Sequence, residues 1–185
     1  MLLSWDKKCS SGYGGKIAIR DSSEALRMIA NRLVNPRDIS IRRAQSSDSE
    51  FAYEALLTIR PYVESTWGDW LEVNGRARTA SDAQAGRSQI VQLASVPVAL
   101  LCVDEFETHL QLDQLYVVPQ YQRRGIGAYV LGLVLADARD SGLPVRLRVL
   151  RVNPARHFYQ RHGFKVVSET PERLFMEHAG TNSPT

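Results

Sequence analysis

The apolar positions of this chain change their spacing along the sequence, and that spacing predicts a mixed α/β domain. Short apolar runs between turn residues predict strands, and stretches in which apolar residues recur every three or four positions predict helices. Both kinds occur between residues 39 and 178, in the order strand, two helices, three strands, helix, strand, helix and two strands. This order favours one sheet with helices on both of its faces.

The predicted elements have the following ranges. Strands are expected at Ile39–Arg42, Gln89–Ala94, Val98–Val103, His109–Val118, Val145–Val152, Phe164–Val167 and Arg173–His178. Helices are expected over Phe51–Ile59, Tyr62–Val73, Ile126–Ser141 and Asn153–His162, whereas the polar stretch Gly75–Gly86 favours a loop or a frayed helix. Ser95-Val96-Pro97 has the composition of a hairpin turn between the second and third strands.

The strand predicted at His109–Val118 contains a slip in its alternation. Leu110 and Leu112 share one face, but the next apolar residues, Leu115 and Val117, have the opposite parity. In a strand with one buried face, a slip across Asp113-Gln114 indicates a β-bulge. The alternative is a strand buried on both faces, where parity carries no information.

The two ends of the chain differ from this central domain. Residues 1–38 are expected to form an N-terminal extension, partly helical over Ser22–Val34, and residues 179–185 a disordered tail. Residues 39–178 are then one domain, a normal size for a single core.

Composition and charge narrow the function classes. The 185 residues are 44% hydrophobic and 23% charged, and the net charge is only +3, with basic residues scattered along the chain. Neither a membrane span nor a nucleic-acid-binding stripe is expected. The four histidines lack metal-ligand spacing, so no metal site is expected. Cys9 and Cys102 are more consistent with a reducing cytoplasm than with a disulfide.

A polar, glycine-containing loop precedes the helix predicted from Ile126. Its sequence is Gln122-Arg123-Arg124-Gly125-Ile126-Gly127-Ala128. Glycines let a backbone approach a ligand closely, the N–H groups at a helix start attract anions, and the two arginines add donors for phosphate. The loop therefore predicts a pyrophosphate site. The alternative is a tight strand-to-helix connection with two exposed arginines.

Several motifs together resemble the GCN5-related N-acetyltransferase (GNAT) superfamily. They are Leu115-Tyr116-Val117-Val118-Pro119, Gln122-x-x-Gly125-x-Gly127-Ala128, Asn153-Pro154-Ala155-Arg156-His157-Phe158-Tyr159 and His162-Gly163-Phe164. The resemblance covers residues 39–178 and is tightest over residues 110–165. It implies a GNAT-like mixed α/β fold, with a mostly antiparallel sheet, a splayed central strand pair and helices on both faces.

The resemblance also implies a cofactor and the residues that hold it. Acetyl-CoA would be the co-substrate, with its pantetheine arm along the backbone of Tyr116, Val117 and Val118. Its pyrophosphate would lie on Gln122, Arg123, Arg124, Gly125, Ile126, Gly127 and Ala128. Asn153 would contact the pantetheine besides capping its helix, and Tyr159 would protonate the departing thiolate. A homodimer is also compatible with the family.

Tyr159 has two interpretations. A hydroxyl donor beside a leaving thiolate accelerates a reaction by about a hundredfold or more as a general acid. Alternatively, Tyr159 packs with Phe158 in the core, as buried tyrosines often do.

The general base is less well specified by the sequence. Glu64, Glu72, Glu107 and Asp113 are the candidates, with Glu64 and Asp113 preferred. Glu64 lies in Pro61-Tyr62-Val63-Glu64-Ser65-Thr66-Trp67-Gly68, which resembles a substrate-lining segment of bacterial family members, although the acids that follow it stand in a different register here. Asp113 lies at the expected bulge. Either acid also has a purely structural interpretation, as a solvated helix charge or as part of the bulge.

The leading hypothesis is therefore an N-acetyltransferase in which a primary amine attacks acetyl-CoA directly in a ternary complex. The amine belongs to a small molecule or a protein, and the Glu64–Glu72 segment hints at a cationic or aromatic-bearing one. The second hypothesis is an acyl-CoA-binding domain without turnover. A nucleic-acid binder is a weaker third.

Overall fold

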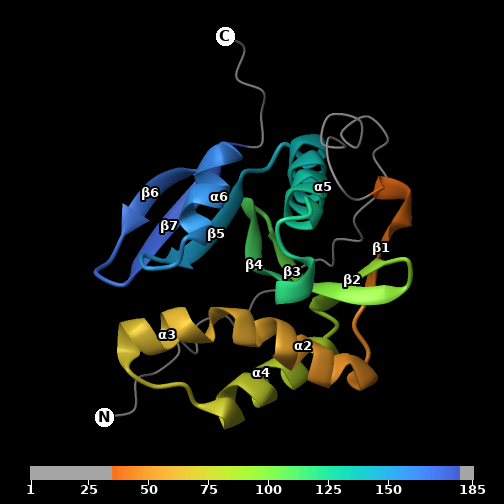
Figure 1. Cartoon of the computed structure of the whole chain (residues 1–185). Coiled ribbons are helices and arrows are strands. Elements are labelled where there is room, and N and C mark those ends of the chain that lie inside the picture. Colours follow the sequence, from red (N-terminus) through yellow and green to blue (C-terminus); the bar gives the residue numbers. More distant parts are fainter. Residues whose placement is uncertain (1–34, 180–185) are drawn as a thin grey trace.

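The computed structural model describes residues 35–179 (Figure 1). The expected N-terminal extension therefore lies almost entirely outside the described residues, as does all but the first residue of the expected tail. The described part begins with a short 3-10 helix, η1 (Pro36–Asp38). None of its helices is long and apolar enough to cross a membrane.

Within the described residues one seven-stranded sheet has the order β1-β2-β3-β4-β5-β7-β6. Its strands are β1 (Ile39–Arg43), β2 (Ser88–Leu93), β3 (Val96–Phe106), β4 (His109–Val117), β5 (Val145–Leu150), β6 (Lys165–Glu169) and β7 (Arg173–His178). All neighbours are antiparallel except β4 and β5, which run parallel. The predicted mixed, mostly antiparallel sheet is confirmed.

Helices cover both faces of this sheet, as predicted (Figure 1). They are α2 (Ser49–Leu56), α3 (Arg60–Trp67), α4 (Glu72–Gln84), α5 (Ile126–Ser141) and α6 (Ala155–Arg161), with 3-10 turns η2 (Ser46–Asp48), η3 (Leu57–Ile59) and η4 (Pro119–Tyr121). The main apolar cluster joins α5 and α6 to one face, and a smaller cluster joins α2 and α4 to the other.

Three local predictions were wrong in detail. The helix expected over Tyr62–Val73 ends at Trp67, because Gly68 with φ of 81° closes α3, and α4 begins only at Glu72. The stretch expected to be a loop or frayed helix is most of the 13-residue helix α4, because its polar face is exposed while Gly75, Thr79 and Ala83 are buried against the sheet and α2. The β2–β3 turn lies at Ala94-Ser95, whose φ values of 47° and 72° suit a two-residue hairpin turn. Pro97 is already in β3, beside a register shift at Val91/Gln92.

The predicted bulge in β4 is present. Cys102 of β3 pairs with Gln114, but the next residue, Val103, pairs with Leu112, so Asp113 is the extra residue. A bulge of this kind resets the alternation. The leucines on both sides of it pack into the same apolar cluster, while Gln114 is buried toward α4.

The same region of β4 separates from β5. The parallel ladder contains only three pairs, from Leu110↔Val145 to Leu112↔Leu147. Beyond Leu112, β4 continues to Val117 with β3 as its hydrogen-bonding neighbour and without β5. The central strand pair is therefore splayed from the bulge onward, which leaves one backbone edge of β4 available to a ligand.

A partly buried ion pair fixes the start of the helical layer, and we expect Asp48→Asn to destabilise the protein. Asp48 accepts hydrogen bonds from Arg42 at 2.7 and 2.8 Å and from the Gln45 N–H at 2.7 Å. The hydrogen bond from Arg42 holds the pKa of Asp48 below its usual value. Losing these charge-assisted bonds should lower the free energy of unfolding by about 2 kcal/mol, measured by urea denaturation at pH 7.

The control for this prediction is Glu72→Gln, which removes the exposed Arg76–Glu72 pair and should cost less than about 0.5 kcal/mol. Because the folded-state pKa of Asp48 is lowered, its stabilisation is present above the unfolded-state pKa, near 3.9, and is lost as the pH falls through the folded-state value. A deficit in Asp48→Asn that stays constant down to pH 2 would contradict this origin.

Candidate active site

The end of β4 and the start of α5 meet through a short, strained connection. After Val117 the chain makes η4, and the Gln122 side chain turns back to donate a hydrogen bond to the Val117 carbonyl at 2.8 Å. Arg123 and Gly125 have φ values of 61° and 84°. An arginine rarely adopts this left-handed conformation, so the backbone of the connection is strained.

This connection leaves donors at the start of α5. No side chain caps the helix, and the first N–H groups of a helix have no acceptor within it. Arg123 and Arg124 are exposed beside them, and the Arg124 guanidinium lies 5.3 Å from the Tyr121 ring centre. The predicted pyrophosphate site therefore combines free N–H groups, the positive end of a 16-residue helix and two guanidinium groups.

The start of α5 also approaches α6. A Cβ atom placed on Gly127 would lie 3.7 Å from both Phe158 and Val117. That distance is ordinary contact, so packing within the protein does not require glycine at this position. The two 3.7 Å contacts do show that the end of β4, the start of α5 and one face of α6 lie against one another.

Tyr159 lies on α6 in a nearly dry environment. Its ring makes edge contacts with Phe158 and Phe164, and the residue is only 9% exposed. Burial, and then the nearby Tyr116, raise the pKa of Tyr159 well above its ordinary value. The hydroxyl thus keeps its proton at neutral pH.

Asn153 caps α6, as predicted. Its Oδ1 accepts the Ala155 N–H at 2.8 Å.

Tyr116 supplies a second buried hydroxyl, which sequence reasoning treated only as backbone. Burial raises the pKa of Tyr116 to about 12, and Arg78, Asp113 and Arg148 are among the charges that act on it. Tyr116 and Tyr159 therefore belong to one desolvated region beside the splay.

A cluster of ion pairs lies beneath this region, on the α4 side of the sheet. Arg87 donates hydrogen bonds to Asp82 at 2.8 Å, to Asp113 at 3.0 Å and to both oxygens of Asp104. Gln114 donates to Asp82 at 3.1 Å. Since Asp113 and Gln114 are the two bulge residues, Arg87 ties the bulge to β3 and α4.

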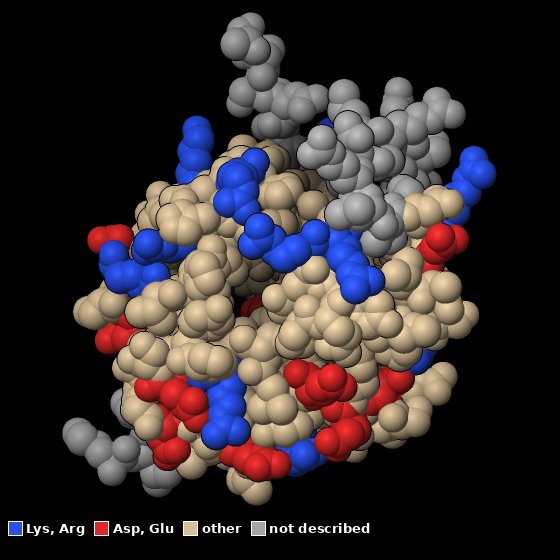
Figure 2. Space-filling view, in the orientation of Figure 1, with Lys and Arg blue, Asp and Glu red and all other residues tan. Residues whose placement is uncertain are grey.

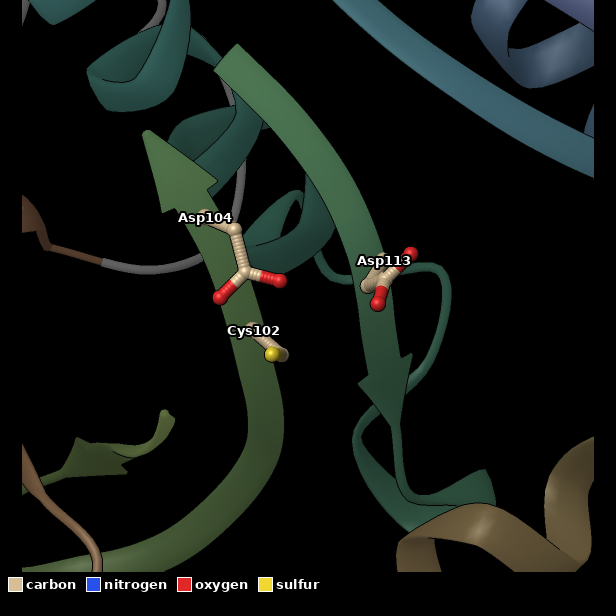
Figure 3. Close-up of side chains that lie close together, drawn as sticks. All are labelled: Cys102, Asp104 and Asp113. Carbon is tan, nitrogen blue, oxygen red and sulfur yellow. The ribbon is translucent and has the colours of Figure 1, made fainter. Parts of the chain in front are cut away.

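Two of these carboxylates and a neighbouring cysteine form a group of potential metal ligands. Figure 3 shows Cys102 and Asp104 on β3 beside Asp113 on β4, and their ligand atoms lie within 4.8 Å of one another. Arg87, however, already binds both carboxylates, so it occupies the place of a cation. Burial and the neighbouring Asp104 raise the pKa of the Cys102 thiol, which disfavours a thiolate ligand or nucleophile.

The structure separates the four candidate bases. The side chain of Asp113 is 6% exposed and lies at the splay. Glu64 is exposed on α3 and pairs with Arg60 at 2.8 Å, and Glu72 is exposed on α4 and pairs with Arg76. Glu107 lies in the turn before β4, at the end of the strand remote from Val117. Among the four candidates, and within the described residues, only Asp113 lies where β4 separates from β5.

Figure 2 shows a hollow near the centre of one face, with acidic atoms at its floor and basic side chains along its upper side. Acidic side chains otherwise gather over the helical layer below.

Arg87, Asp82, Asp104 and Arg148 are the residues of this region that sequence reasoning missed. The sequence offered one signal for this cluster, the charge of Asp104 directly after the apolar strand predicted at Val98–Val103. A charge beside a buried strand requires a partner.

Comparison with known proteins identifies one family model that matches part of this chain. Residues 88–166 match a family model described as an acetyltransferase (GNAT) domain. A search of curated proteins gave no significant sequence match.

Solved structures with this fold include PaiA N-acetyltransferase from Thermoplasma acidophilum in complex with coenzyme A. It is 21% identical over 76% of this chain and 98% of its own, with a TM-score of 0.57. Another is the ribosomal-protein-S18-alanine N-acetyltransferase of Escherichia coli, 19% identical over 79% of this chain and 96% of its own, with a TM-score of 0.56. At these identities the likeness establishes the fold.

Proposed function

This chain belongs to the GNAT superfamily of acetyltransferases by the domain that includes residues 88–166, and we propose that it transfers the acetyl group of acetyl-CoA to a primary amine. The observation that carries the proposal is the uncapped start of α5 beside the splay of β4. It offers donors for a pyrophosphate at one end and an unpaired strand edge for a pantetheine arm at the other.

The chain's own groups suit each step of direct transfer. The amine nitrogen attacks the thioester carbon, and the new C–N bond replaces the C–S bond. Backbone N–H groups near Val117 stabilise the negative charge that develops on the carbonyl oxygen. Asp113 Oδ1 accepts the proton from the amine, and the Tyr159 hydroxyl donates to the departing sulfur.

A covalent route through a cysteine is not part of this proposal. Cys102 is fully buried and its thiol pKa is raised, so it is a poor nucleophile. Glu64 is retained in the proposal only as a residue of the substrate-lining helix α3, because its carboxylate is exposed and paired with Arg60.

Gly125→Ala tests the cofactor site. Gly125 has φ of 84°, and alanine in this conformation is strained by about 1–2 kcal/mol. Relief of the strain would move the N–H groups at the start of α5, so the Kd for acetyl-CoA, measured by calorimetry, should rise about tenfold.

Gly142→Ala is the matched control, because Gly142 lies at the other end of α5 with φ of 68° and open space around it. It should lose similar stability without losing acetyl-CoA affinity. Equal effects of the two substitutions on affinity would argue against a pyrophosphate site at the start of α5. An absence of acetyl-CoA binding by the wild type would overturn the proposed function.

The alternative is a domain that binds acyl-CoA without turnover. It predicts normal acetyl-CoA affinity but no thiol release with any member of an amine library. The desolvated Tyr159 hydroxyl favours the enzyme, because simple binding requires no proton donor at the sulfur.

A further inference from the structure

Arg148 differs from the other arginines of its strand. Arg146, two residues earlier on the same face of β5, donates to Glu177 at 2.7 Å. Arg151, just after β5, lies 3.2 Å from Glu169 and donates to the Thr170 carbonyl. Among the described residues, by contrast, the nearest acidic oxygen to Arg148 is Asp113 Oδ1 at 3.9 Å, and Arg148 makes no hydrogen bond.

That 3.9 Å contact crosses the opening between β4 and β5. A charge-assisted hydrogen bond is about 2.7–2.9 Å long, so the two groups face each other without being joined. Asp113 Oδ2 is held by Arg87 at 3.0 Å, which leaves Oδ1 directed toward Arg148. The opening therefore presents one anionic and one cationic group side by side.

The surroundings of this pair point to a ligand rather than to a structural ion pair. Arg148 is 36% exposed and has Phe175 as its cross-strand neighbour on β7, with no acid opposite it. Helix α3 contacts β5 nearby, and Arg148 acts electrostatically on the buried Tyr116 hydroxyl. A guanidinium with vacant donors at the edge of a desolvated site is suited to bind a carboxylate.

We propose that the acceptor is a small amine that carries a carboxylate next to its amino group, as a free α-amino acid does. Its nitrogen lies at Asp113 Oδ1 and its carboxylate at Arg148. This proposal rests on the proposed function, because it names the substrate class of the same site. A zwitterion replaces a loose ion pair with two hydrogen-bonded ones while the total charge of the opening stays unchanged.

The test uses the full chain, acetyl-CoA, the standard L-amino acids and their α-carboxamides as matched probes. Thiol release should show that the accepted amino acid exceeds its carboxamide in kcat/KM by about tenfold to a hundredfold, the effect of one charge-assisted bond. Arg148→Gln should remove that preference, and Arg148→Lys should retain part of it. Arg146→Gln, on the same strand face, should keep it whole.

Two measurements separate this inference from the function on which it rests. Calorimetry with acetyl-CoA reports the cofactor site, and calorimetry with the amino acid, with and without CoA, reports the acceptor site even if turnover is absent. Carboxamides or peptide N-termini used as well as free amino acids, a preference unaffected by Arg148→Gln, or no amino-acid binding would each overturn the inference. All three outcomes would leave the acetyltransferase proposal standing, whereas failure to bind acetyl-CoA would overturn the proposed function itself. Thermal melting of each variant confirms that it is folded.

Discussion

Tyr159→Phe should lower kcat by about a hundredfold or more, the typical contribution of a general acid, and leave the affinity for acetyl-CoA nearly unchanged. Phenylalanine keeps the edge contacts that the ring makes with Phe158 and Phe164. The proposed cofactor site consists of the end of β4 and the start of α5, so it does not depend on the hydroxyl. The loss should therefore appear in turnover, measured by thiol release at saturating acetyl-CoA.

The environment of Tyr159 determines how it acts. Its raised pKa keeps it protonated, so the donor form is fully present from pH 6 to pH 9. A higher pKa also makes it a weaker acid, yet the departing thiolate enters the same desolvated space, where its own pKa rises as well. The proton is then shared between two groups whose acidities have moved in the same direction.

The pH profile supplies a further check on this role. Any loss of activity between pH 8 and pH 10 should not come from Tyr159, because that group ionises only above its ordinary value of about 10. An inflection in that range that disappears in Tyr159→Phe would contradict the assignment. Tyr53→Phe is the control, since the Tyr53 hydroxyl accepts a 3.3 Å hydrogen bond from Trp70 within the helical layer. It should leave turnover unchanged.

Local sequence rules predicted the part of the site that depends on backbone geometry. The slip between Leu112 and Leu115 predicted the bulge, because a strand with a fixed buried face has no other way to change parity. Asn153 predicted the cap of α6, and the recurrence of Ile126, Val130 and Val134 predicted α5, in which all three are buried.

The partners of Asp113 could not be predicted in the same way. Asp82 comes from the end of α4, Arg87 from the segment after it, and Arg148 from β5. Nothing local in the sequence states that they meet, because their contacts depend on how α4 lies against the sheet and how far β5 departs from β4. The helix α4 itself was underestimated because a polar surface helix, stabilised mainly by packing, resembles a loop in composition.

The cluster around Arg87 gives the second large expected effect. Arg87→Ala should lower the free energy of unfolding by about 3 kcal/mol, the lower end of the cost of removing one partner of a buried ion pair, because the Arg87 side chain keeps 29% of its exposure. Three carboxylates, Asp82, Asp104 and Asp113, would lose the guanidinium that bonds all of them. Chemical denaturation at pH 7 measures the loss.

Arg76→Ala is the matched control for burial. Arg76 also binds two carboxylates, Glu50 and Glu72, but all three side chains are largely exposed. Water replaces such contacts, so the substitution should cost less than about 1 kcal/mol. Similar losses from Arg87→Ala and Arg76→Ala would show that the cluster is solvated and is not the anchor of the bulge.

A rescue experiment locates the effect in charge rather than in packing. Asp104→Asn added to Arg87→Ala removes one of the stranded negative charges and should recover part of the lost stability. If the cluster also holds the bulge, Arg87→Ala should weaken acetyl-CoA binding, because relaxing Asp113 and Gln114 would allow β4 to close toward β5. A destabilised variant with unchanged cofactor affinity would mean that the splay is fixed elsewhere, by the pairing of β4 with β3 alone.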